Sequence, residues 1–234
     1  MFYPNRYHRN PAPNPAPNPN PDPDQIPSPG PNPNTNPSFG PYDNIGCITY
    51  SQVNLVNEMR YLCLQLVIWS RAYITNNAAR QAAVPAIYER LYSVPNGFYP
   101  YMNLFFGQEI AEQFINLASQ HIIIFANLIN AMSIGNQQAA NSSQSAWHEN
   151  ADGIASFLVQ INNSWNINQW HNLLNRYLEM FLDEAIAVMS SDYRREIAIY
   201  DRLQYQSLLI ADYMSRGVTE SLLGNPGNRT SQSY

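Results

Sequence analysis

The sequence contains no lysine, so all twelve of its basic residues are arginine. Charged residues make up only 12% of the chain, against about 25% in a typical soluble protein. The net charge of −5 provides no basic excess for binding nucleic acid or an anionic membrane, and we expect neither as a partner. The polarity comes instead from 29 asparagines and 15 glutamines. Such a weakly charged surface favours self-association. Compositional drift in the lineage is an alternative explanation for the low charge and the many amides.

Cysteine is also scarce. Cys47 and Cys63 cannot build a disulfide framework, and Cys63 lies in a helical pattern where a small buried side chain is expected. The amino-terminal residues lack the apolar core of a signal peptide, and no run approaches the roughly 18 apolar residues of a membrane span. We therefore expect synthesis in the cytoplasm and no membrane-spanning helix.

Catalytic motifs are missing as well. The chain has no glycine-rich phosphate loop, no serine nucleophile elbow and no cysteine–histidine pair at an informative spacing. These absences favour a protein that is not an enzyme and holds no cofactor.

Proline is distributed unevenly. Residues 1–41 contain fourteen of the eighteen prolines, and none occurs between Pro100 and Pro226. Proline removes backbone donors and holds its neighbours extended, so residues 1–43 are predicted to form a disordered Pro/Asn-rich arm. The remainder divides into a helical domain over 44–218 and a frayed polar tail over 219–234.

Apolar residues in the domain recur at helical spacing, with no sustained alternation typical of strands. Helices are therefore predicted over the following ranges: 50–75, 107–133, 143–161, 169–189 and from 192, capped by Asp192, to 216, with a stop at Gly217. A shorter piece over 78–92 contains Pro85, and 94–100 reads as a loop. These elements predict an all-α bundle of long, mostly antiparallel helices with a short crossover helix, for which a ferritin-like arrangement is one form.

His121 is the sharpest candidate for a functional residue. It lies on the apolar stripe of the helix predicted over 107–133, where an imidazole needs a partner. Metal sites in bundles use Glu-x-x-His motifs, and the sequence contains none. We expect a neutral core histidine bonded across the bundle to Asn150 or Tyr177, with a metal ligand as the alternative. No residue is assigned to catalysis, a cofactor or a metal.

Four further polar residues are candidates for a buried layer. Asn150 and Asp152 lie on one predicted helix, Asp201 on the last, and Arg71 near the end of the first. The alternative is a solvated face with a single interhelical ion pair.

The order of motifs resembles an uncharacterised helical family of spore-forming Firmicutes, whose members often carry the label acetylglutamate kinase although they lack kinase motifs. The matching stretches span roughly residues 60–218: Ile68-Trp69-Ser70-Arg71, Phe106-Gly107, Gln120-His121-Ile122, Ala126 to Ala131, Ala146 to Leu158, Trp165, Trp170, Glu184-Ala185, Ile197 to Asp201 and Ile210 to Met214. The resemblance is most specific from Ala146 to Leu158.

The chain departs from this family at its polar core. Members look like carriers of Glu-x-His on the first helix and of Glu-His on two others. Here the three positions read Leu64-Gln65-Leu66, Gln120-His121 and Arg176-Tyr177. The resemblance implies a scaffold that has lost any metal or acid–base site.

We therefore expect a structural protein that associates with itself, deposited on the spore surface or in its coat, where the Pro/Asn arm contacts other coat-type proteins. The alternative is a ferritin-like metal-binding or ligand-binding protein, or an enzyme, whose core site is degenerate here.

Overall fold

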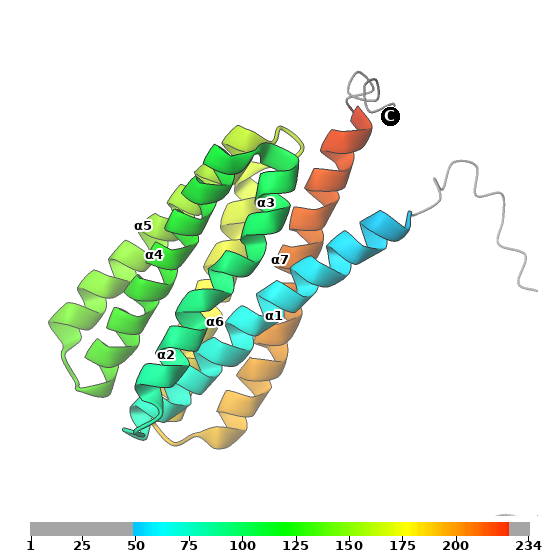
Figure 1. Ribbon diagram of the computed structural model, residues 1–234. Helices are drawn as coiled ribbons and strands as arrows, with labels where there is room; N and C mark the ends of the chain where they lie inside the picture. Colours follow the sequence, from blue (N-terminus) through cyan, green and yellow to red (C-terminus); the bar gives the residue numbers. More distant parts are fainter. Residues whose placement is uncertain (1–48, 225–234) are drawn as a thin grey trace, which may run out of the picture. The chain divides into compact units, whose positions relative to one another are not determined.

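The computed structural model describes residues 49–224, and the arm predicted over 1–43 lies outside the described residues, as do residues 225–234 of the predicted tail. The described range forms seven α-helices, one 3-10 helix and no strand, which confirms the predicted all-α fold (Figure 1). The elements are α1 (Tyr50–Ala78), α2 (Val84–Ser93), η1 (Val94–Phe98), α3 (Tyr99–Phe106), α4 (Gln108–Ser133), α5 (Gln137–Ile161), α6 (Ile167–Met189) and α7 (Tyr193–Gly224).

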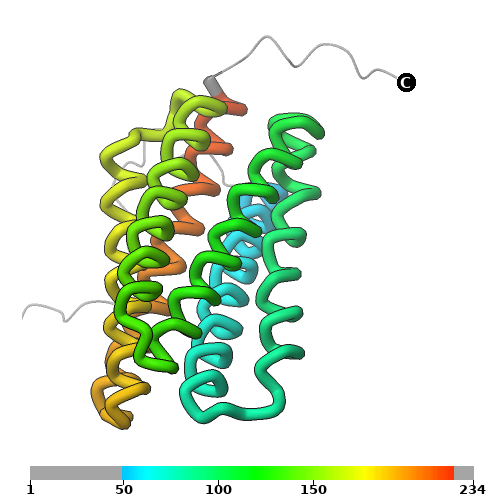
Figure 2. Tube along the Cα trace, turned by 90° about the vertical axis from the view of Figure 1, so that its left-hand side faces the viewer, coloured from blue at the N-terminus to red at the C-terminus, as the bar shows by residue number. Residues whose placement is uncertain are grey.

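Long helices that follow one another run in opposite directions and pack side by side (Figures 1 and 2). The most extensive pairings join α4 to α5, α1 to α7 and α6 to α7. The short elements α2, η1 and α3 follow one another back along α1 and lead into α4 (Figure 2). This arrangement is the predicted bundle of antiparallel helices with a short connecting segment between two long ones.

The predicted loop over 94–100 is wrong, because that segment is helical. Pro95 lies in the first turn of η1 and Pro100 in the first turn of α3. Proline is tolerated in a first turn, where its missing amide has no intrahelical partner. The two prolines therefore begin short helices here. Pro85 does the same for α2.

The predicted end of the last helix at Gly217 is also wrong, since α7 continues to Gly224. Gly217 lies within the helix under the indole of Trp165, and a Cβ atom placed on it would come within 1.8 Å of the indole Nε1. Glycine occupies this position because a large side chain packs closely against the helix there, and not because the helix ends. The predicted frayed tail therefore begins at least six residues too early, and Val218 is buried.

Three turns between helices place one residue in the left-handed region: Arg80 (φ +52°), Gly135 (φ +72°) and Ser191 (φ +59°). In each turn the next residue's amide bonds to the carbonyl five positions earlier, which is the Schellman pattern. At the end of α4 the left-handed residue is glycine, which adopts this conformation without steric cost. Asp192 caps α7 as predicted, since its Oδ1 accepts from the Arg195 amide at 3.2 Å.

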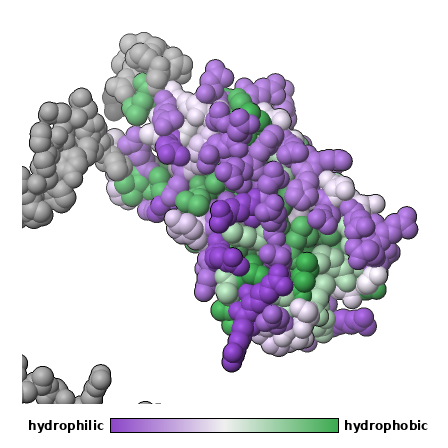
Figure 3. All heavy atoms as spheres, turned by 180° about the vertical axis from the view of Figure 1, so that it is seen from behind, coloured by the Kyte–Doolittle hydropathy of each residue, from purple (hydrophilic) through white to green (hydrophobic). Residues whose placement is uncertain are grey.

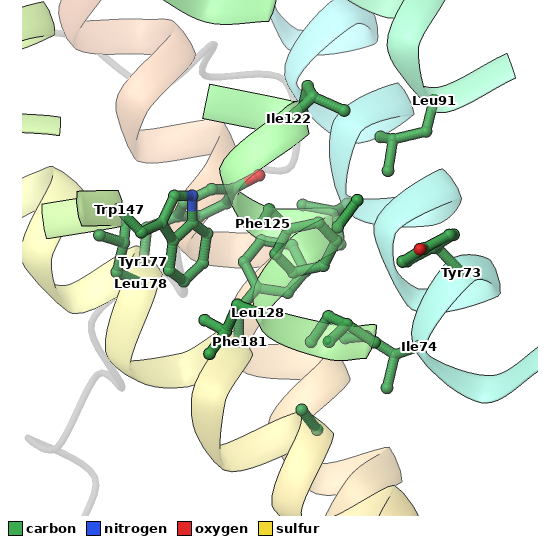
Figure 4. Packing of buried hydrophobic residues seen from close by; sticks show 14 of the residues in the cluster. Tyr73, Ile74, Leu91, Ile122, Phe125, Leu128, Trp147, Tyr177, Leu178 and Phe181 are labelled. Carbon is green, nitrogen blue, oxygen red and sulfur yellow. The ribbon is translucent and has the colours of Figure 1, made fainter. Parts of the chain in front are cut away.

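The bundle buries two neighbouring hydrophobic clusters. The first centres on Phe125, Trp147 and Phe181, whose rings lie 5.3 to 6.3 Å apart (Figure 4). The second lies toward the opposite end of the helices and includes Trp165 and Trp170. Three partly buried residues pack against both clusters: Leu66, Leu174 and Ile210. The two clusters therefore meet along α1, α6 and α7.

Helix α4 is long and apolar enough to cross a membrane by length and composition. In the structure its apolar residues Phe114, Ile122 and Phe125 are buried in the bundle core. Of its most apolar 18-residue window, 39% is buried in the bundle, where α4 packs chiefly against α5 and α3.

Candidate functional site

A cavity of about 100 Å³ lies in the bundle where the two clusters meet. Helices α1, α4, α5, α6 and α7 form its wall together with η1, and the wall is almost entirely carbon. The lining residues are Cys63, Leu66, Pro95, Phe98, Phe114, Ala118, His121, Ile122, Ile154, Leu158, Trp170, Leu174, Tyr177, Ser207, Ile210 and Met214. The predicted candidate His121 is therefore part of this wall.

The imidazole of His121 is held across the bundle by Asn150. His121 Nδ1 lies 2.7 Å from Asn150 Oδ1, and Asn150 Nδ2 donates to the Leu117 carbonyl at 3.3 Å. The bond to the Leu117 carbonyl fixes the orientation of the Asn150 amide. Asn150 Oδ1 therefore faces His121 and accepts a hydrogen bond from a protonated His121 Nδ1. The ring also packs against Trp147, with 5.1 Å between centroids.

Burial lowers the pKa of His121 to about 4, because the charged imidazolium loses its hydration, and the bond to Asn150 only partly opposes this. The side chain is therefore neutral at pH 7. The expected core histidine with Asn150 as its partner is the arrangement that the structure contains.

The three positions where the resemblance implies histidines converge on the cavity, and only one of them, His121, is a histidine in this chain. Leu66 on α1, His121 on α4 and Tyr177 on α6 all line it. The positions where the resemblance implies acids, Leu64, Gln120 and Arg176, are not among the lining residues. Gln120 and Arg176 are exposed, and Leu64 is half-buried. The chain thus places two carbon-rich side chains and one neutral histidine around this space.

The cavity wall offers weak chemistry for a metal. Within residues 49–224, no three histidine, cysteine, aspartate or glutamate side chains gather closely enough to hold an ion. Burial raises the pKa of the Cys63 thiol to about 12, so this residue stays protonated rather than becoming a thiolate ligand.

The structure does not bring the predicted polar layer together. Asp152 is 57% exposed and lies 3.6 Å from His171 Nε2 at the surface, and Asp201 is also exposed. Asn150 faces His121, and Arg71 bonds to Glu196 on α7. Solvent is the better environment for an unpaired carboxylate, and this accounts for the outward placement of both aspartates. Arg71 pairs with Glu196, which was not among the candidates. The alternative of a single interhelical ion pair is also not what the described residues contain, because further pairs join Arg60 to Asp212 and Arg195 to Asp183.

A buried titratable group, Glu184, was not predicted from the sequence. Glu184 on α6 has no exposed surface, and neither of its carboxylate oxygens has a hydrogen-bond partner within the described residues. Arg71 Nε lies 3.8 Å from Glu184 Oε1 but 2.5 Å from Glu196 Oε1. The Arg71 guanidinium also lies 4.4 Å from the centre of the Tyr200 ring. This cluster links α1, α6 and α7.

Burial raises the pKa of Glu184 to about 8, and the nearby Glu196 carboxylate adds to the rise while Arg71 opposes it. Glu184 is therefore largely protonated at pH 7. The sequence did contain a signal for Glu184. It follows Tyr177 by seven residues, so both lie on the buried face of α6.

No family model, curated protein or solved structure matches this chain. The resemblance to the spore-former family accordingly stays a prediction, and the site must be interpreted from its own geometry.

Proposed function

We propose that this protein is a non-enzymatic structural protein that associates with itself and is incorporated into a spore coat or spore surface. The observation that carries the proposal is an apolar end of the bundle, formed by the α4–α5 and α6–α7 turns and called here the turn end. Its most exposed large apolar residues are Ile134 (70% exposed), Tyr193 (63%) and Ile186 (47%).

Two hollows lie at the turn end, of about 500 and 630 Å³. Met132, Gly135 and Met189 line both of them, so the hollows are neighbours. Ile134 is part of the same turn as Gly135. The hollows have mixed polar and apolar linings. An exposed apolar side chain beside hollows on one surface is an arrangement that suits a self-complementary contact. Methionine side chains adapt readily to such a partner.

The composition supports a second copy of this chain as the occupant. The surface lacks lysine and is rich in amides, so copies repel one another weakly. Beyond the turn end, apolar residues also lie in separate groups among hydrophilic ones on the face in Figure 3. Additional contacts of this kind suit a protein that packs into a layer.

Self-association is tested by size-exclusion chromatography with light scattering on the full chain. Ile134→Asp places a charge at the turn end and should shift the protein toward monomer. Leu104→Asp is the matched control, because Leu104 is 73% exposed on α3, toward the other end of α4. It should leave the assembly unchanged. Equal masses for the two variants and the unmodified chain would reject the turn end as the contact.

The spore assignment rests on the resemblance of residues 60–218 and is tested separately. A fluorescently tagged copy made during sporulation should collect around the forespore. A signal spread evenly through the mother cell would contradict a role in the coat or on the surface.

The second candidate is a ferritin-like metal-binding or ligand-binding protein, or an enzyme, whose site is degenerate in this chain. The convergence of Leu66, His121 and Tyr177 on one cavity favours it. Elemental analysis of purified protein distinguishes the two candidates. Stoichiometric iron, manganese or zinc that disappears in His121→Ala would support the second candidate, whereas its absence from both proteins would support the first.

A further inference from the structure

The cavity wall exposes few groups that would hold water, although Trp170 in the wall has an indole Nε1 without a partner in the described residues. Its surface is almost all carbon, contributed by residues such as Phe98, Leu158 and Met214. A buried water needs two to four polar partners, and cavities without them stay dry. Protein cores are otherwise close-packed, so this space represents contacts that the folded chain leaves unmade.

The few polar side chains in the wall are neutral or already bonded. His121 Nδ1 is engaged by Asn150, and Ser207 Oγ donates to the Gln204 carbonyl at 2.7 Å. The raised pKa of Cys63 keeps its thiol uncharged. A charged ligand would therefore lose its hydration in the cavity without gaining a partner. An uncharged, apolar ligand would lose little and gain dispersion contacts.

We infer that this cavity is a binding site for a small, uncharged, apolar molecule of about the size of benzene. Six elements of the fold line it, and its wall is almost entirely carbon. The inference is independent of self-association, since the turn-end residues Ile134, Ile186 and Tyr193 do not line the cavity.

Benzene itself is the probe, added to the full chain during thermal unfolding. A ligand that binds only the folded state stabilises it by RT ln(1 + L/Kd), where L is the free ligand concentration, so Tm rises with L. At several times Kd the increase should be about 2–4 °C, and it should continue to grow with the logarithm of the benzene concentration. Unchanged or lowered Tm across the soluble range of benzene would overturn the inference.

The location is tested with a pair of matched variants. Ala118 lines the cavity, so Ala118→Leu should fill it and abolish the benzene-dependent rise in Tm. Ala139 packs against the first cluster away from the cavity, so Ala139→Leu should keep the rise. A rise that survives in Ala118→Leu would show that benzene binds elsewhere.

A measurement on the unmodified chain decides the matter if Ala118→Leu does not fold. Nuclear Overhauser effects should connect benzene protons with methyl groups of Leu174 and Ile210, which line the cavity on α6 and α7. Contacts restricted to other methyl groups would overturn the inference.

Discussion

Gly217 on α7 lies against the indole of Trp165, so closely that a Cβ atom would overlap the ring Nε1 at 1.8 Å. The same indole nitrogen donates to the Tyr213 carbonyl at 3.2 Å, which holds the ring on the helix. This contact joins the α5–α6 connection to the last helix and explains a glycine in a helix interior.

Gly217→Ala should consequently destabilise the protein, by about 1–3 kcal/mol, because the added methyl group forces the indole to move. Gly153→Ala is the control, since a Cβ atom on Gly153 in α5 would meet nothing within 4 Å. That change should stabilise the protein by about 0.5–1 kcal/mol through helix propensity. Urea unfolding measures both. Stabilisation of the same size at both positions would contradict the packing described for Trp165.

His121 and Glu184 should oppose each other in the pH dependence of stability. The pKa of His121 falls from 6.5 to about 4 on folding, so its contribution decreases as pH drops from 6.5 toward 4. The pKa of Glu184 rises from 4.5 to about 8, so its contribution is complete below 4.5 and decreases as pH rises toward 8. Between about 4.5 and 6.5 the two slopes cancel. Above 6.5 only the Glu184 slope remains.

Two single variants should separate these slopes. In His121→Leu, the free energy of unfolding should decrease as pH rises from 5 to 6.5, by up to about 1.4 kcal/mol per pH unit. In Glu184→Gln it should increase over the same interval, with a similar slope. Urea unfolding at half-unit pH steps provides the profiles. Parallel profiles for the two variants would show that at least one of these groups is not buried in the assigned protonation state.

Ser191 offers a test of the turns. It adopts φ +59° without the freedom of glycine, and a left-handed conformation costs a non-glycine residue about 1–2 kcal/mol. Ser191→Gly should therefore stabilise the protein, by about 1 kcal/mol or less once the flexibility of glycine in the unfolded chain is included. The neighbouring Ser190 has φ −88° and bonds to the Ile186 carbonyl, so Ser190→Gly should destabilise it. Thermal unfolding of the two variants compares them directly.

The sequence predicted the fold well because its long apolar stripes have one helical interpretation. The prediction from sequence failed where one residue type is found in two different structural contexts. Pro95 and Pro100 suggested a loop but occupy first turns, and Gly217 suggested a stop but accommodates Trp165. Only tertiary contacts separate these alternatives.

The candidate site was predictable only in part. His121 was found because a polar residue interrupts an apolar stripe, and its partner Asn150 follows from the facing helix. Glu184 interrupts the stripe of α6 in the same way and was missed. The cavity itself has no sequence signal, because a void depends on how side chains from six elements fail to meet.

The central proposal is self-association, and sedimentation equilibrium of the unmodified full chain tests it most directly. Measured at neutral pH over a hundredfold range of concentration, the mass should rise from near one chain toward a defined multiple, and Ile134→Asp should lower it at every concentration. A single-chain mass throughout the range would contradict the proposal.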